Sequence, residues 1–340
     1  LFTFPRPAAL PMFGLAAAAA PAPGALLVPA RRGRGHPFLL HGLAAAGLVV
    51  VLFTGRATNS ARSWIDLAGG FKLQPSEFMK IGVLLALAKW FAGRKRPRRL
   101  EELVVPAALV GLPVALVLAQ PDLGTALTFG PLFLAMCWIA GTPWRLLRWV
   151  VLVPLALAPI ALMAVQDYQR ERVEVWLQQD HLSDEQKKAE GYQIWHSKMA
   201  VGTGGVSGFG WGKGPENRYD LLPERHNDFI FPVIAEELGL VGAASFLAIY
   251  AAIGLLALRG AIRQRDPFTR FVVAGVGVHF LDHLLLNVGV TLGLLPTTGL
   301  PLPMVSFGGS AMMASGVAIG LLLVVSADRQ PLFGDRAFED

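Results

Sequence analysis

The residues best able to do chemistry in this sequence lie where a polar loop gives way to an apolar helix. The segment Leu221–Gly239, LLPERHNDFIFPVIAEELG, carries six ionisable side chains and leads directly into the apolar run Leu238–Leu258. Ionisable groups at the mouth of a membrane span are costly and are by default candidates for function. Asp228 could accept a proton, bind a cation or pair with a basic neighbour. It could equally be a helix-terminal carboxylate that the helix dipole stabilises.

A second group of candidates is basic and lies between Thr54 and Lys80. Arg56, Arg62 and Lys72 belong to a connection predicted below to face outside, where the positive-inside bias disfavours cations. Arginine binds phosphate oxygens in bidentate fashion, so a diphosphate at the membrane surface is the anion that we expect. Contact with lipid headgroups is the alternative. Trp64 in the same connection is interpreted as an interfacial belt residue.

Charged and polar residues inside apolar runs form a third group. Glu77 and Lys80 are three residues apart, so they share a helix face, and at the entrance of an apolar span we expect this pair to face the bundle interior. Asp122, in Gln-Pro-Asp-Leu-Gly, either caps the following helix or faces a cavity. Asn287 interrupts an apolar span, where an amide usually bonds across helices. Ser306 and Ser310 belong to a Pro- and Gly-rich corner that is either a phosphate cradle or a plain helix connection.

No motif for a metal or a nucleotide is present. The seven histidines lack HExxH spacing, and the chain has no P-loop, no dinucleotide fingerprint and no GxSxG elbow. Cys137 is the only cysteine, which excludes an internal disulfide and a thiolate metal site. We therefore predict no resident metal, although a divalent cation, Mg²⁺ or Mn²⁺, could assist a diphosphate.

Composition defines the protein class. Of the 340 residues, 54% are hydrophobic and only 16% are charged, against about 25% charged in soluble domains. Apolar runs approach the ~20 residues that cross a bilayer. The sequence therefore predicts an all-α polytopic membrane protein with one integral membrane domain, 1–340. We predict nine spans, namely Ala8–Pro29, Pro37–Phe53, Ser76–Ala92, Leu103–Ala119, Gly124–Ala140, Leu146–Val165, Phe229–Leu258, Phe271–Leu295 and Ser310–Ser326.

Basic clusters predict the orientation of these spans. Clusters of arginine and lysine occupy every second connection, as the positive-inside rule requires of cytoplasmic loops; they are Arg31–Arg34, Arg94–Arg99, Arg145–Arg148 and Arg259–Arg270. A cytoplasmic N-terminus then needs one further helix upstream, so we expect ten in the full protein. The longest outside connection is 166–228, between the seventh and eighth of the ten, and loops of that length are usually functional. Its glycine-rich half, VGTGGVSGFGWGKG, is expected to approach a ligand closely.

Five stretches together resemble the SEDS family (shape, elongation, division and sporulation), most closely its RodA-type members. They are QPSEFMK, QPDLGTA, GYQIWHSKMAVGTGGVSGFGWGKG, LLPERHNDFIFPVIAEELGLVG and NVGVTLGLLPTTGLPLPMVSFGGSA, in the expected order between Thr54 and Ser326. The sequence departs from the family pattern at Ser63, which replaces one arginine of a pair, at Asn227 and at His283. The serine weakens any argument for a paired-arginine clamp.

The resemblance implies a ten-helix bundle that polymerises lipid II into peptidoglycan strands, in complex with a class B penicillin-binding transpeptidase of the cell-wall elongation machinery. It implies that Asp228, in the large outer loop, is the essential aspartate, and that Glu77, Lys80 and Asp122 match family positions linked to activity. It places the chain in the bacterial inner membrane, with its active site on the outer face and with no nucleic acid partner.

The chemistry of lipid II suggests roles for these residues. An α-linked donor and a β-linked product require one inverting displacement, for which Asp228 is the candidate general base. The leaving diphosphate needs cations, and the candidates are Arg62, Lys72, Lys198, Lys213, Arg218 and Arg225. A lipid II flippase and a non-catalytic scaffold for a transpeptidase are the competing interpretations. A flippase needs polar groups along a path to both faces, whereas here the unusual charges gather toward one side.

Overall fold

The computed structural model describes residues 36–327 except 59–60, 67–71, 165–166 and 190. This part of the chain is mostly helical, which confirms the predicted fold class. The expected span Ala8–Pro29 lies outside the described residues, and the count of ten helices stays a prediction. The long helices are α3 (Pro37–Thr54), α4 (Pro75–Ala92), α5 (Val104–Ala119), α6 (Leu123–Ile139), α7 (Trp144–Ala164), α12 (Ile230–Ile262), α13 (Pro267–Thr291) and α14 (Gly309–Ala327). Their ends lie within four residues of the predicted spans.

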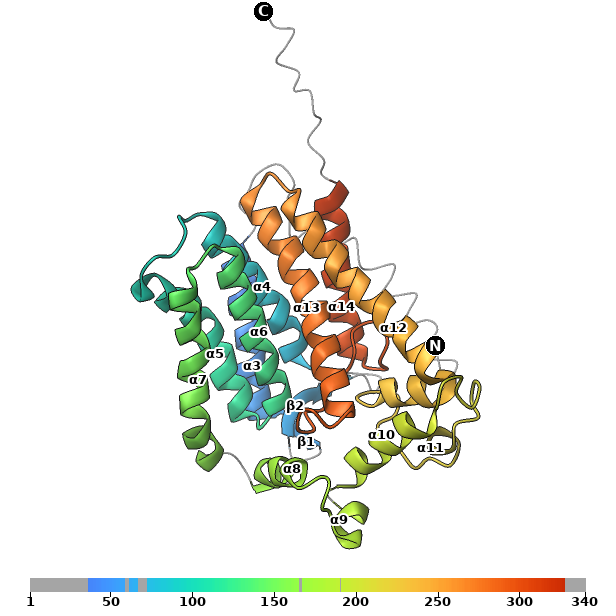
Figure 1. The fold of residues 1–340 in the computed structure, drawn as a ribbon. Helices are drawn as coiled ribbons and strands as arrows, with labels where there is room; N and C mark the ends of the chain where they lie inside the picture. Colours follow the sequence, from blue (N-terminus) through green and yellow to red (C-terminus); the bar gives the residue numbers. More distant parts are fainter. Residues whose placement is uncertain (1–35, 59–60, 67–71, 165–166, 190, 328–340) are drawn as a thin grey trace, which may run out of the picture.

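Helices α4 and α13 form the centre of the bundle. Both are apolar around most of their circumference, as expected of helices enclosed by others, and almost every residue of α4 from Pro75 to Ala88 is buried. They pack against each other, and α3, α6, α12 and α14 pack around them (Figure 1). The predicted pair Glu77 and Lys80 lies in α4.

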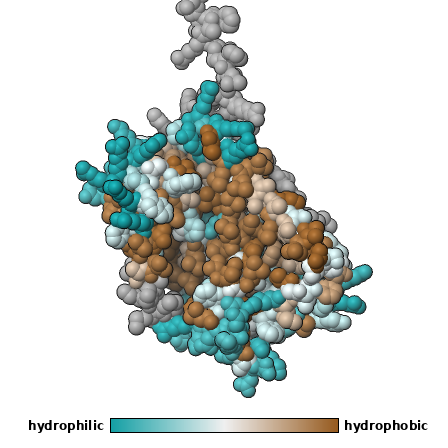
Figure 2. Space-filling model, viewed as in Figure 1, coloured by the Kyte–Doolittle hydropathy of each residue, from teal (hydrophilic) through white to brown (hydrophobic). Residues whose placement is uncertain are grey.

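The outer surface of the bundle is apolar. Large side chains on its outer helices are exposed, among them Phe53 at 85% and Ile249 at 68%. Figure 2 shows an apolar band between two hydrophilic ends. Within the residues that the structure describes, four helical segments are long and apolar enough to cross a membrane, at residues 37–54, 100–119, 230–262 and 267–291. Because exposed apolar area of this extent is unstable in water but not in lipid, the chain is a multi-pass membrane protein.

The two ends of the bundle differ. The basic connection around Arg94–Arg99, with the 3-10 helix η2 (Leu100–Leu103), lies at the same end as the turn between α12 and α13. The opposite end carries the short helices α8 (Asp167–Leu177), α9 (Asp184–Lys188), α10 (Tyr192–Thr203) and α11 (Pro215–Arg218). This separation has the pattern that the positive-inside rule predicts for a cytoplasmic and an outer end.

A small antiparallel sheet precedes α4, and the sequence analysis did not predict it. Its order is β1 (Arg56–Thr58), β2 (Ala61–Asp66) and β3 (Lys72–Leu73), with Ile65 opposite Leu73. The hydroxyl of Ser310, at the start of α14, accepts a hydrogen bond from the Gln74 amide and donates one to the Lys72 carbonyl, both at 2.9 Å. These bonds fix the end of β3 against the bundle, so Lys72 has a defined position.

Helix α12 is broken near its start, at Gly239, whose backbone angles are φ 66° and ψ −168°. The glycine-rich segment pairs with the break: the amides of Phe209 and Gly210 donate to the carbonyls of Glu236 and Glu237, at 3.1 and 2.9 Å. A Cβ atom on Gly208 would lie 2.2 Å from the Glu237 carbonyl oxygen. The close approach that the sequence predicted therefore exists, but its partner is the backbone of α12. The glycine-rich segment thereby supplies hydrogen bonds to the two backbone carbonyls that the break leaves without helical partners.

Candidate active site

A cavity of about 530 Å³ opens at the end of the bundle that carries α8 and the sheet. Its wall combines α8, the start of α6, strands β2 and β3, and the connection from α13 to α14. The residues on its wall that matter for chemistry are Trp64, Lys72, Asp122, Tyr168, Arg172 and Asp228. Glu224 also lines it, so among the described residues three carboxylates and two cations from four distant parts of the sequence share one space. Trp64 lines this cavity, so its interpretation as only a belt residue is incomplete.

The backbone that carries Asp228 is held from one side by α13 and the α13–α14 connection. Three successive carbonyl groups, those of residues 226–228, each accept one hydrogen bond. The donors are the Phe307 amide at 2.7 Å, the Ser306 hydroxyl at 2.5 Å and the Asn287 side-chain amide at 2.8 Å. Asn287 and Ser306, which the sequence placed near the cavity, are thus bound to the backbone of the Asp228 segment and do not line the cavity.

The Asp228 carboxylate, by contrast, accepts no hydrogen bond from the part of the chain that the structure describes. Gly299 packs beside it, since a Cβ atom there would lie 3.5 Å from Oδ2. Burial raises the pKa of Asp228 to about 7, and the neighbouring Glu224 carboxylate adds to this effect, while the Arg172 cation opposes it. A carboxylate of that pKa, open to a cavity, can take up a proton near neutral pH.

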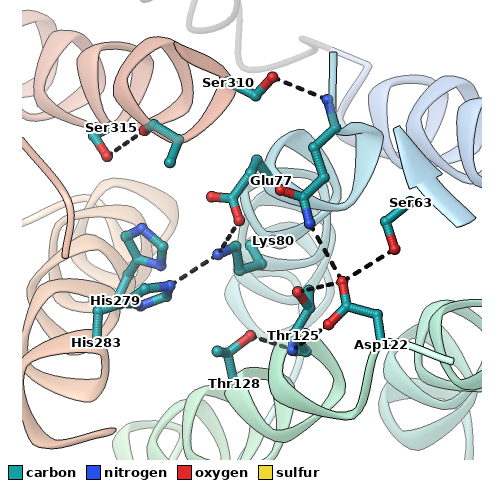
Figure 3. A network of polar contacts seen from close by, with 12 residues as sticks. Ser63, Glu77, Lys80, Asp122, Thr125, Thr128, His279, His283, Ser310 and Ser315 are labelled. Atoms are coloured by element: carbon teal, nitrogen blue, oxygen red, sulfur yellow. Dashed lines mark hydrogen bonds and ion pairs between the residues drawn. The ribbon is translucent and has the colours of Figure 1, made fainter. Parts of the chain in front are cut away.

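The Asp122 carboxylate, unlike that of Asp228, accepts several hydrogen bonds (Figure 3). It accepts bonds from the Thr125 amide at 3.0 Å and the Thr125 hydroxyl at 2.8 Å, as the cap of α6. It also accepts weaker bonds from Ser63 Oγ at 3.4 Å and Gln74 Nε2 at 3.3 Å. Both interpretations offered from the sequence apply, because this helix cap also lines the cavity. It ties together the sheet, α4 and α6.

The cations of the cavity are Lys72, which the sequence indicated, and Arg172, which it did not. Arg172 Nη1 donates to the Thr297 carbonyl at 3.3 Å. The sequence contained a signal: Tyr168, Gln169, Arg172 and Val173 follow the spacing of one helix face, and all four line the cavity.

Four other predicted diphosphate ligands are not on the cavity wall; they are Lys198, Lys213, Arg218 and Arg225. Lys198 pairs with Asp180 at 3.0 Å on the exposed surface. Arg225 pairs with Asp220 and donates to the Asn217 carbonyl at 3.0 Å. Arg62 lies in β2, and its side chain is outside the described part of the structure.

The predicted pair Glu77–Lys80 is buried and extends to a third residue (Figure 3). Lys80 Nζ donates to Glu77 Oε1 at 2.9 Å and lies 2.8 Å from His283 Nε2. His283 Nδ1 lies 2.9 Å from the His279 carbonyl, which can only accept. Nδ1 therefore carries the proton, and Nε2 accepts from Lys80. The histidine that departs from the family pattern thus accepts a hydrogen bond from a buried lysine.

The helical bundle has an apolar belt and, at one end, a cavity lined by ionisable side chains. These features define a multi-pass membrane protein with a polar site at one membrane boundary. Within the described residues, no three His, Cys, Asp or Glu side chains gather as a metal site. The FtsW/RodA/SpoVE family model, described as cell cycle protein, matches residues 24–331. The chain belongs to this family.

Two relatives and two structures illustrate the similarity. Peptidoglycan glycosyltransferase MrdB of Escherichia coli K12 is 38% identical over 289 residues, covering 84% of this chain and 76% of that protein. Peptidoglycan glycosyltransferase RodA of Treponema pallidum is 31% identical over 361 residues, covering 84% and 82%. A chain of a peptidoglycan synthase complex that coordinates polymerization and crosslinking superimposes with a TM-score of 0.76 at 32% identity, covering 96% and 92%. The crystal structure of Thermus thermophilus RodA superimposes with a TM-score of 0.68 at 30% sequence identity, covering 96% of this chain and 89% of that one.

Proposed function

We propose that this chain polymerises lipid II at the cavity, by an inverting displacement in which Asp228 is the general base. The class of enzyme rests on the comparisons: the chain is a peptidoglycan glycosyltransferase, since relatives that carry this name match more than four fifths of it. The reaction and the residue roles are our inference from the site.

The observation that carries the proposal is the Asp228 carboxylate, which accepts no hydrogen bond from the described residues and shares its cavity with two cations. The acceptor hydroxyl becomes a strong nucleophile only as a base removes its proton, and a raised pKa suits Asp228 to that transfer near neutral pH. The O–C1 bond to the donor sugar forms on the face opposite the departing diphosphate. The bond from C1 to the diphosphate breaks, and its electron pair leaves with the lipid diphosphate.

Lys72 and Arg172 are the groups that we assign to the leaving diphosphate. Both line the cavity with Asp228, and fixed cations stabilise negative charge that develops as the bond breaks. A divalent cation, Mg²⁺ or Mn²⁺, would supply further stabilisation when bound with the diphosphate.

The membrane context completes the proposal. We infer that the chain lies in the bacterial inner membrane with the cavity at the outer face, where the lipid tails of both substrates remain in the bilayer. The structural match to a chain of a peptidoglycan synthase complex supports a class B penicillin-binding transpeptidase as its partner. Elongation of the cell wall is the process that we assign to it, because RodA is among the matched relatives.

The decisive test uses purified protein in proteoliposomes with lipid II supplied on the cavity side. We expect Asp228→Ala and Asp228→Asn to lose polymerisation by at least the ~10²–10⁴-fold that general-base catalysis provides. Exposed Glu185→Gln, on α9, is the matched control that removes a carboxylate elsewhere. Polymerisation at the wild-type rate by Asp228→Asn would disprove the base assignment. Because no flipping step is needed in this arrangement, product formation also separates polymerisation from transport.

A further inference from the structure

Glu236 and Glu237 are the buried carboxylates that the proposed mechanism does not use. Both side chains are 0% exposed, and they end the first segment of α12, directly before the break at Gly239. Buried carboxylates are costly unless they are hydrogen-bonded. Their hydrogen-bond partners therefore show what these two side chains hold in place.

Those partners lie in α11, in the outer loop. Glu236 accepts hydrogen bonds from the backbone amides of Glu216 at 2.9 Å and Asn217 at 3.4 Å. Glu237 Oε1 accepts from the Asn217 side chain at 2.6 Å. The other Glu237 oxygen has no hydrogen-bond partner among the described residues. The two glutamates therefore fix Asn217 through both its backbone and its side chain.

Asn217 in turn holds the segment that carries Asp228. Its carbonyl accepts from Arg225 Nη1 at 3.0 Å. Arg225 is part of the turn in which the amides of Asn227 and Phe229 both donate to the Glu224 carbonyl, at 2.9 and 3.3 Å. Helix α13 and the α13–α14 connection hold this segment on its other side, through the carbonyls of residues 226–228. The Asp228 backbone is thus fixed between two independent sets of contacts.

We propose that Glu236 and Glu237 are positioning residues for Asp228, acting through Asn217 and Arg225. This inference rests on the proposed role of Asp228 as the base. Neither glutamate lines the cavity, so loss of their contacts displaces the base and leaves the cations in place. A displacement of about 1 Å at a reacting group can cost ~100-fold in rate.

The test compares Glu237→Leu with Glu237→Gln. Leucine fills similar volume without an acceptor, whereas glutamine keeps the one oxygen that Asn217 uses. We expect Glu237→Leu to lower kcat ~10- to 100-fold with KM within about threefold of wild type. We expect Glu237→Gln to restore kcat to within about threefold of wild type. Asn217→Ala should reproduce the loss, because it removes the same bond from its other partner.

Hydrogen exchange of the same proteins gives a second readout that does not depend on activity. We expect faster exchange in Glu237→Leu at residues 215–229 and unchanged exchange in α10 and in α12 beyond Gly239. Wild-type kcat in Glu237→Leu, equal losses in the leucine and glutamine variants, or faster exchange throughout the loop and α12 would each overturn the positioning role. Asp228→Asn is assayed alongside: activity in that variant refutes the proposed function, whereas an inactive Asp228→Asn with an active Glu237→Leu refutes only the positioning role.

Discussion

The pKa of Asp228 predicts a pH dependence that an ordinary aspartate could not produce. Burial and the Glu224 carboxylate raise this pKa from 3.8 to about 7. A general base acts only when deprotonated, so the deprotonated fraction of Asp228 should set the acidic limb of kcat/KM, which reports the free enzyme. We expect that limb to have its midpoint near pH 7 and a slope of one.

The size of the effect follows from the two pKa values. With a pKa of about 7, about 1% of Asp228 is ionised at pH 5, so kcat/KM should fall about 100-fold from its plateau. With the ordinary value of 3.8, about 94% would be ionised at pH 5, and the activity would hardly change. The two cases therefore differ by about two orders of magnitude at one accessible pH.

The assay is glycan polymerisation from lipid II in proteoliposomes between pH 5 and 9. Two variants test whether the acidic limb of the pH profile reports the titration of Asp228. Glu224→Gln removes a carboxylate that raises the pKa of Asp228, so the midpoint should move to lower pH. Arg172→Gln removes a cation that lowers it, so the midpoint should move to higher pH. A flat profile down to pH 5, or midpoints that do not move in opposite directions, would refute the assignment of this limb to Asp228.

Three further predictions concern stability. Asp228→Asn should raise the unfolding temperature at pH 8. The raised pKa makes the ionised form unfavourable in the folded state, so wild type loses stability as pH rises from 3.8, the ordinary pKa, to about 7, the folded pKa. This loss is on the order of 1–2 kcal/mol after discounting the full ~4 kcal/mol for partial exposure. Lys80→Met should destabilise the bundle by ~3–5 kcal/mol in denaturant titrations in detergent, because Glu77 then remains as an unpaired buried charge. A double variant that also carries Glu77→Leu should recover most of the lost stability. A double variant as unstable as Lys80→Met would contradict the role of the ion pair. Gly124→Ala should lower both the unfolding temperature and the rate of polymerisation, because its Cβ would lie 1.9 Å from the Thr298 carbonyl oxygen in the cavity wall. A wild-type unfolding temperature and rate would show that the backbone at Thr298 can move to admit the methyl group.

Helix positions were predictable because the bilayer requires long apolar segments with few charges. The expected span Ser76–Ala92 and the helix α4 differ by one residue at the start. The sheet was not predictable, since β1 and β3 have three and two residues, too few for an alternating pattern. The break at Gly239 was missed for a related reason: hydropathy continues through it, and only the contacts with residues 205–210 show that the helix is interrupted.

The composition of the site was harder to predict than its central residue. Charge at a membrane boundary made residues 221–239 a candidate site, and the family resemblance singled out Asp228 within it. Proximity in sequence then grouped Asp228 with Arg225, which turns away to Asp220 and Asn217. Its cavity neighbours Lys72 and Arg172 lie 156 and 56 residues earlier in the numbering of the chain. Only the packing of α8 and the sheet against the bundle brings these side chains together. A basic residue in a long loop therefore carries little information until the face of its helix is known.

Asp122 and Asp228, two of the three carboxylates on the cavity wall, have different chemical capacities, and their hydrogen bonds decide which of these two can be the base. Asp122 accepts four hydrogen bonds, two of them from Thr125, so its lone pairs are occupied in holding α6 against α4 and the sheet. Protonation of Asp122 would break part of that network. The Asp228 carboxylate accepts none from the described residues, while its backbone carbonyl is fixed by Asn287. A base must be held in place and yet keep a lone pair for the incoming proton, and holding the group through its backbone satisfies both needs. Asp228 meets this condition, whereas Asp122 could meet it only by giving up its structural role.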